Sequence, residues 1–169
     1  MKKLLKTNLF LLIITVSFFI TSCFDNSIPG RTFEQEMAEL NEQITLLNED
    51  GYDVDTTESG VYYITHQEGE GPLVSEGDTV KINYIGYLNN GYIFDATASW
   101  SPDSTWEFIY LEQPLIQGFN DGLAVMNKGS EVEMIIPSNL AYGEYGTGTI
   151  GSFQTLIFSV KMIDIKPPL

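Results

Sequence analysis

Beyond Gly60, apolar side chains recur at every second position in several separate segments. Side chains alternate between the two faces of a β-strand, so this repeat predicts strands with one apolar face each. The clearest segments are residues 61–65, 79–87, 106–110, 131–136 and 156–162. Turn signals separate them at 68–72, at 76–78 and at Asn89-Asn90-Gly91, where a tight hairpin is favoured. The segments together predict an antiparallel sheet with one solvated face.

Two stretches follow the helical repeat instead. The first covers residues 32–50, where apolar residues step by four and three along one stripe: Phe33, Met37, Leu40, Ile44 and Leu47. Thr32 and Gln35 fit a capping box, and Gly51 is placed to end the helix. The stripe has two interpretations: packing on the domain that follows, which we favour, or a dimer seam, which fewer than three heptads would make marginal.

The second helical stretch is short. Phe119, Leu123 and Met126 mark an amphipathic helix between Gly118 and Met126. A short helix against an antiparallel sheet defines an α+β fold, here preceded by the amphipathic helix at 32–50.

Residues 1–22 are expected to be a signal peptide, with Cys23 as the first residue after it. Three lysines precede an apolar run over residues 9–20, and the small Thr21 and Ser22 follow. The segment resembles a bacterial lipoprotein signal, in which the cysteine carries the acyl chains; an uncleaved anchor and an ordinary signal peptide are the alternatives. We therefore divide the chain into a signal at 1–22, a tether at 23–31, a helix at 32–50 and a domain at 51–169.

Composition excludes several kinds of site. The 169 residues include 8 basic and 23 acidic ones, a net charge of −15, which disfavours a nucleic-acid partner. Cys23 is the single cysteine, so neither an intrachain disulfide nor a multi-cysteine metal site is expected. The lone His66 has no recognisable nucleophile motif beside it, and the glycine-rich run at 143–148 lacks the lysine of a phosphate-binding loop. We expect no cofactor and no metal.

Four motifs in order resemble the FKBP-type peptidyl-prolyl isomerases over about residues 59–165. They are INYIGYL followed by NGYIFD at 82–95, PLIQGFNDGL at 114–123, PSNLAYG at 137–143 and TLIFSV at 155–160. The resemblance implies a twisted antiparallel sheet wrapped around a short helix, with a shallow apolar pocket that accepts proline.

Carried over motif by motif, the resemblance implies a set of site residues. Tyr84, Asp95 and Tyr142 would act in catalysis, with the Tyr142 hydroxyl and the Ile116 backbone N–H bonding substrate carbonyls. The apolar lining would be Phe94, Trp106, Leu115, Ile116, Phe119, Ile150 and Phe158. Phe119 stands where the family usually has Trp, residues 151–154 lack two common prolines, and residues 96–105 lack an Arg that often pairs with the Asp.

The resemblance implies an isomerase of X-Pro bonds in exported proteins, held in the bacterial cell envelope by acyl chains on Cys23. The alternative is a weakly active or inactive proline-binding chaperone or interaction module of an envelope complex, such as a motility apparatus. The expected partners are proline-containing polypeptides and the membrane through the lipid, with no nucleic acid; a monomer is favoured.

Overall fold

The computed structural model describes residues 30–168, so the predicted signal peptide and Cys23 lie outside the described residues. Helix α1 spans Phe33–Glu49 and α2 spans Gln117–Leu123, with short 3-10 turns η1 at Thr97–Ser99 and η2 at Ser138–Leu140. The strands are β1 (Asp55–Thr56), β2 (Tyr62–Gln67), β3 (Glu70–Leu73), β4 (Thr79–Leu88), β5 (Ile93–Ala96), β6 (Trp106–Ile109), β7 (Asn127–Lys128), β8 (Glu131–Ile136) and β9 (Leu156–Lys166).

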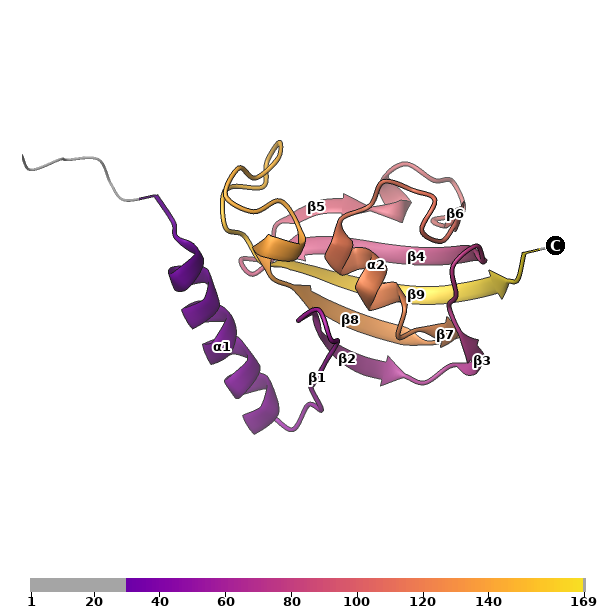
Figure 1. Ribbon diagram of the computed structural model, residues 1–169, viewed down its shortest axis with the longest axis horizontal. Coiled ribbons are helices and arrows are strands. Elements are labelled where there is room, and N and C mark those ends of the chain that lie inside the picture. Colours follow the sequence, from indigo (N-terminus) through magenta and orange to yellow (C-terminus); the bar gives the residue numbers. More distant parts are fainter. Residues whose placement is uncertain (1–29, 169) are drawn as a thin grey trace, which may run out of the picture.

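The strands form one main antiparallel sheet and one small ribbon. The main sheet has the order β1-β2-β8-β9-β4-β5, with β6 also paired to β4, and the ribbon joins β3 to β7. The two longest strands, β4 and β9, pair from Thr79 opposite Lys166 to Leu88 opposite Leu156, and a β-bulge shifts the register between Lys81 and Ile82. Figure 1 shows α2 lying across this sheet. The predicted α+β fold, with an antiparallel sheet around a short helix, is confirmed.

Helix α2 lies close to β8 because two of its residues have no side chain. A Cβ at Gly118 would lie 2.2 Å from Ile136 Cγ2, and one at Gly122 would lie 2.4 Å from Met134 Sδ. Any larger residue would force the helix away from the sheet. The main core fills the space between them, with Leu123, Met134 and Ile136 fully buried.

Helix α1 begins as the sequence predicts. The Thr32 hydroxyl accepts a hydrogen bond from the Gln35 N–H, and the Gln35 side chain accepts one from the Thr32 N–H, which completes the capping box. Gly51 follows the helix with φ of +90°, a conformation that favours glycine.

The apolar stripe of α1 packs on the sheet of its own chain. Leu40 is fully buried against Ile135 of β8 and Ile157 of β9, with Met37 and Ile44 beside it. These two isoleucines alternate with core residues, so α1 covers the face opposite α2. The expectation of a solvated second face is therefore wrong where α1 lies.

The turn predicted at 68–72 is only partly correct. Glu70 pairs with Lys128 and Leu73 with Asn127, so this segment and the short β7 form an irregular ribbon. All four residues of β3 are exposed, so the strand carries no apolar alternation that could reveal it.

Candidate active site

One cavity of about 450 Å³ lies between α2, the sheet and two long loops. Its wall contains all ten residues that the sequence assigned to the domain's site: Tyr84, Phe94, Asp95, Trp106, Leu115, Ile116, Phe119, Tyr142, Ile150 and Phe158. Pro114, Thr147, Gly148 and Thr149 complete the wall. The structure thus brings together predicted residues from β4, β5, β6, α2 with the residues before it, the β8–β9 loop and β9, while their individual roles stay predictions.

The deepest part of the cavity is aromatic. The Phe119 ring lies edge-on to Phe158 and Tyr84, with centroids 4.8 and 5.7 Å apart. All three rings are buried, and aromatic pairs at these distances and angles attract one another. The result is a firm apolar floor contributed by α2, β9 and β4.

Gly86 makes room for two of the rings. It lies opposite Phe158 in the β4–β9 pairing, and a Cβ there would lie 2.8 Å from the rings of Phe158 and Phe94. Phe94 packs edge-on against Phe158 at 5.4 Å. Glycine at this position therefore sets how far these rings lie from the strand.

A single carboxylate, that of Asp95, lies in the wall. The Tyr84 hydroxyl donates a hydrogen bond of 2.6 Å to Asp95 Oδ2. Burial and the nearby Asp95 carboxylate both raise the pKa of Tyr84 well above its usual value of 10.0. Tyr84 is therefore a neutral donor at physiological pH, and its hydroxyl holds the Asp95 side chain at the edge of an apolar surface.

The first residue before α2 presents a backbone donor. Ile116 is the N-cap of the helix, with extended φ and ψ of −61° and 144°. Its carbonyl accepts hydrogen bonds from Phe119 and Asn120, whereas the N–H of an N-cap residue precedes the intrahelical bonds. This geometry leaves the Ile116 N–H outside the helical ladder at the cavity wall.

The loop between β8 and β9 forms the opposite side. It contributes Tyr142, which is 38% exposed, and the buried Ile150. Thr147 and Ile150 exchange two backbone hydrogen bonds of 2.8 Å, which close the tip of the loop. The glycine-rich run at 143–148 thus contributes to the cavity wall.

Besides Pro114 and residues 147–149 of the wall, sequence reasoning missed Trp100, which lies beside the site. It is 51% exposed, and its ring lies edge-on to Trp106 with centroids 6.0 Å apart. Trp100 also partly offsets the rise in the pKa of Tyr84. The available signal was a large aromatic residue within a polar stretch.

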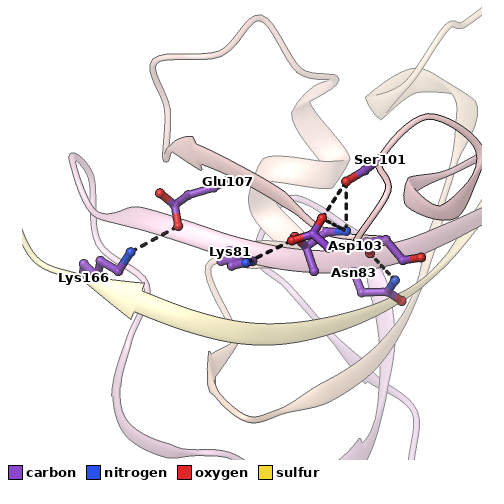
Figure 2. Close-up of polar contacts among 8 residues, drawn as sticks. Lys81, Asn83, Ser101, Asp103, Glu107 and Lys166 are labelled. Atoms are coloured by element: carbon purple, nitrogen blue, oxygen red, sulfur yellow. Dashed lines mark hydrogen bonds and ion pairs between the residues drawn. The ribbon is translucent and has the colours of Figure 1, made fainter.

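The loop that carries Trp100 is held by a polar network around Asp103 (Figure 2). Asp103 accepts hydrogen bonds from the hydroxyls of Ser101 and Thr105, each 2.7 Å long, and Lys81 Nζ lies 3.3 Å from Oδ2. The two hydroxyl donors hold the pKa of Asp103 well below its usual value, and the bond from Thr105 has the larger effect. Asn83 bonds the Ser104 carbonyl and the buried Thr97 at the start of the loop.

The cavity has the chemistry of a binding surface for an apolar ring. Its wall combines aromatic and aliphatic groups with one carboxylate, two phenols and a backbone N–H. His66 lies on β2, where its Nε2 is 3.9 Å from Glu133, and takes no part in the wall. Among residues 30–168, no three His, Cys, Asp or Glu side chains gather as a metal site requires. In the same part of the chain, neither helix is long and apolar enough to cross a bilayer.

Comparison with known proteins gives the same family from sequence and from structure. The family profile described as FKBP-type peptidyl-prolyl cis-trans isomerase matches residues 71–163. A probable isomerase of this type from Haemophilus influenzae is 37% identical over 118 residues, which cover 69% of this chain and 47% of the relative. The isomerase FkpA of Escherichia coli K12 is 30% identical over 143 residues, covering 85% and 47%. The chain spans about half the length of these relatives.

Two solved structures extend the comparison. The crystal structure of FkpA from Escherichia coli has a TM-score of 0.64 and 28% identity, covering 81% of this chain and 64% of that one. A peptidyl-prolyl isomerase from Pseudomonas syringae has a TM-score of 0.64 and 25% identity, covering 82% and 98%. With the profile match over more than half of its residues, the chain belongs to the FKBP-type peptidyl-prolyl cis-trans isomerase family.

Proposed function

We propose that this protein is a peptidyl-prolyl cis-trans isomerase that acts on X-Pro bonds of exported polypeptides. The observation that carries the proposal is the cavity itself, in which all ten expected residues meet: nine aromatic or aliphatic side chains around the single carboxylate of Asp95. A proline ring fits such a surface, since it is apolar and has no N–H to leave unpaired.

The reaction needs no general acid or base. Rotation about the X-Pro bond breaks the conjugation of the amide and meets a barrier of ~18–20 kcal/mol. The planar amide is more charge-separated than the twisted one, so an apolar cavity disfavours the ground state more than the transition state. Every ~1.4 kcal/mol of difference gives about a tenfold acceleration.

Four groups would contact the substrate in this mechanism. The proline ring would lie on Phe119, while the Ile116 N–H and the Tyr142 hydroxyl would donate to the carbonyls on either side of the twisting bond. Asp95, fixed by its 2.6 Å bond from Tyr84, would face the twisting amide from the cavity wall. Each of these contacts orients the substrate or stabilises its twisted form.

A proline-binding module with little turnover is the second candidate. The observation that favours it is the β8–β9 loop, which has Gly151 and Ser152 where the family often has two prolines. The 88% exposed Tyr145 and the half-exposed Trp100 add aromatic surface suited to holding a polypeptide.

We further propose that the protein works in the bacterial cell envelope, attached by acyl chains on Cys23. The basic, apolar and small-residue parts of residues 1–22 support this, and the relatives named above are bacterial. Without these residues the chain keeps 8 − 3 = 5 basic and 23 acidic residues, which anionic lipids repel. Attachment would then depend on the lipid, and Cys23→Ser should release the protein from the membrane fraction.

A protease-coupled or NMR exchange assay tests the enzyme proposal. The protein without residues 1–22 should accelerate isomerisation of X-Pro peptides, with a rate that depends on the residue before proline. Asp95→Ala and Tyr142→Phe should each lower kcat/KM while far-UV and near-UV circular dichroism stay unchanged. A folded protein that binds the peptides without acceleration would support the binding module instead.

A further inference from the structure

We infer that helix α1 positions the β8–β9 wall of the cavity, and that Glu36 is the positioning residue through which it does so. The inference rests on the proposed function and deepens it, since it assigns to the N-terminal helix a part in the same site. The contacts behind it join α1 to residues more than a hundred positions further along the chain.

Glu36 is a fully buried carboxylate with hydrogen-bond donors around both of its oxygens. It is 0% exposed, and it accepts three hydrogen bonds. The Ser138 N–H donates to Oε1 at 2.7 Å, the Thr155 hydroxyl donates to Oε1 at 2.8 Å, and the Ser138 hydroxyl donates to Oε2. Each oxygen of the carboxylate therefore has a donor, which is what a buried carboxylate requires.

The donors stand at the two ends of one loop. Ser138 lies two residues after β8 ends, and Thr155 immediately precedes β9. Between them lie five residues of the cavity wall: Tyr142, Thr147, Gly148, Thr149 and Ile150. A single side chain of α1 thus ties together both ends of the segment that forms this wall.

Backbone hydrogen bonds carry the constraint to Tyr142. The Ser138 carbonyl accepts from Ala141 at 2.9 Å and from Gly143 at 2.8 Å, the two neighbours of Tyr142. The Gly143 carbonyl in turn accepts from the Phe153 N–H at 2.8 Å. Fixing Ser138 therefore fixes the backbone on both sides of the proposed catalytic tyrosine.

Arg31 adds a second contact at the same loop. Its Nε donates to the Phe153 carbonyl at 2.7 Å, and its guanidinium pairs with Glu39 of α1 at 2.7 Å. A continuous chain of hydrogen bonds thus leads from Glu36 through Ser138, Gly143 and Phe153 to Arg31, which lies just before the helix. Neither Glu36 nor Arg31 lines the cavity, so both hold the loop from outside it.

A role in positioning explains why a carboxylate occupies this place. Leu40 already docks the helix through apolar contacts with Ile135 and Ile157. A buried carboxylate contributes little net stability, because its desolvation offsets much of the gain from its hydrogen bonds. What it adds is directionality, since three donors are held at fixed angles in a way that apolar packing does not achieve.

The test uses five variants of the same protein. Glu36→Ala removes all three bonds, whereas Glu36→Gln keeps one acceptor oxygen for the Ser138 N–H. Arg31→Ala removes the second contact and serves as an independent variant if Glu36→Ala does not fold. Glu42→Gln is the matched control, an exposed glutamate on the same helix. Val80→Ala is the stability control, a buried residue near the opposite end of β4 from the loop.

Two readouts separate positioning from simple loss of stability. The first is kcat and KM for a proline peptide at a temperature where every variant is folded. The second is amide hydrogen exchange at Gly143 and Phe153 relative to amides of β4. We expect Glu36→Ala to lower kcat/KM by about 10–100-fold, as small misplacements of a site do, and to speed exchange at both amides at least about tenfold. Glu36→Gln should keep most of the wild-type kcat/KM and most of the protection of the two amides. Arg31→Ala should speed exchange at the Phe153 amide.

The results that would overturn the inference are equally specific. If the amides of Gly143 and Phe153 exchange as slowly in Glu36→Ala as in the wild type, then α1 does not hold the loop. A loss of kcat/KM in Val80→Ala equal to that in Glu36→Ala would show that stability alone is responsible. If the wild-type protein fails to accelerate isomerisation, the proposed function fails, while the exchange measurements still decide whether Glu36 fixes the loop.

Discussion

The hydrogen bond between Tyr84 and Asp95 gives the sharpest quantitative prediction. The bond is 2.6 Å long, its donor is buried, and its acceptor is a half-buried carboxylate. Hydrogen bonds to charged groups contribute ~1.5–3 kcal/mol to stability, and partial exposure of Asp95 reduces this toward ~1–2 kcal/mol. We therefore expect a coupling energy of about 1–2 kcal/mol between the two side chains.

A double-mutant cycle measures this coupling. Urea unfolding at pH 7 is followed for the wild type, Tyr84→Phe, Asp95→Ala and the double variant. Each single variant leaves a polar group without its partner, so we expect each to lose ~1–3 kcal/mol in the free energy of unfolding. The double variant should lose less than the sum, because neither unpaired group remains.

A coupling below about 0.5 kcal/mol would refute this reasoning, since independent sites add within that margin. It would mean that solvent replaces the bond at little cost. Asp95 would then not be held by Tyr84, and the proposed mechanism would lose the interaction that fixes its carboxylate.

Three further predictions concern stability and packing. The pKa values of Tyr84 and Tyr87 are raised above 10.0 in the folded protein, mainly by burial. The stability that these neutral phenols contribute is therefore present below pH 10 and is lost as the pH rises above it. Tyr87→Phe should make the free energy of unfolding fall less steeply between about pH 9 and 11, as measured by urea unfolding. Leu40→Ala should lower the free energy of unfolding by ~2–5 kcal/mol, because it opens a cavity between α1 and the sheet. Leu46 lies on the same helix but is 53% exposed, so Leu46→Ala should change the free energy of unfolding by less than about 0.5 kcal/mol. Gly86→Ala should cost ~1–3 kcal/mol and lower kcat/KM, because the new methyl displaces the rings of Phe94 and Phe158 that form the wall.

Each of these has a contrary outcome. An alkaline decline that is identical in Tyr87→Phe would show that other groups cause it. Equal losses in Leu40→Ala and Leu46→Ala would mean that α1 is not docked on the sheet in solution. A Gly86→Ala protein with full stability and activity would show that the rings have room to move.

Local sequence pattern predicted the elements that have a clear repeat. The capping box at Thr32 and Gln35, the five alternating strands and the hairpin at Asn89–Gly91 all formed as expected, because caps, strand alternation and tight turns depend on near neighbours. Strand β3 was missed for the same reason: its four exposed residues carry no alternation, and only pairing with β7 makes it a strand.

The motifs in the sequence, read through their resemblance to a known family, also named the residues of the cavity. The ten assigned residues meet at one wall because strand pairing and the packing of α2 bring six separate segments together. Trp100 was not assigned, since its place beside Trp106 depends on the Asp103 network that holds its loop.

Only the tertiary structure decided what the N-terminal helix does. The sequence determined that residues 32–50 form an amphipathic helix, and it left open whether the stripe packs on the domain or on a second copy. Docking on β8 and β9 buries Leu40, and the same docking places Glu36 against Ser138 and Thr155. A helical repeat reports which residues share a face, but the groups that this face meets lie over a hundred residues away, and no local pattern specifies them. For that reason the part that the buried Glu36 carboxylate plays in supporting the cavity can be inferred only from the fold.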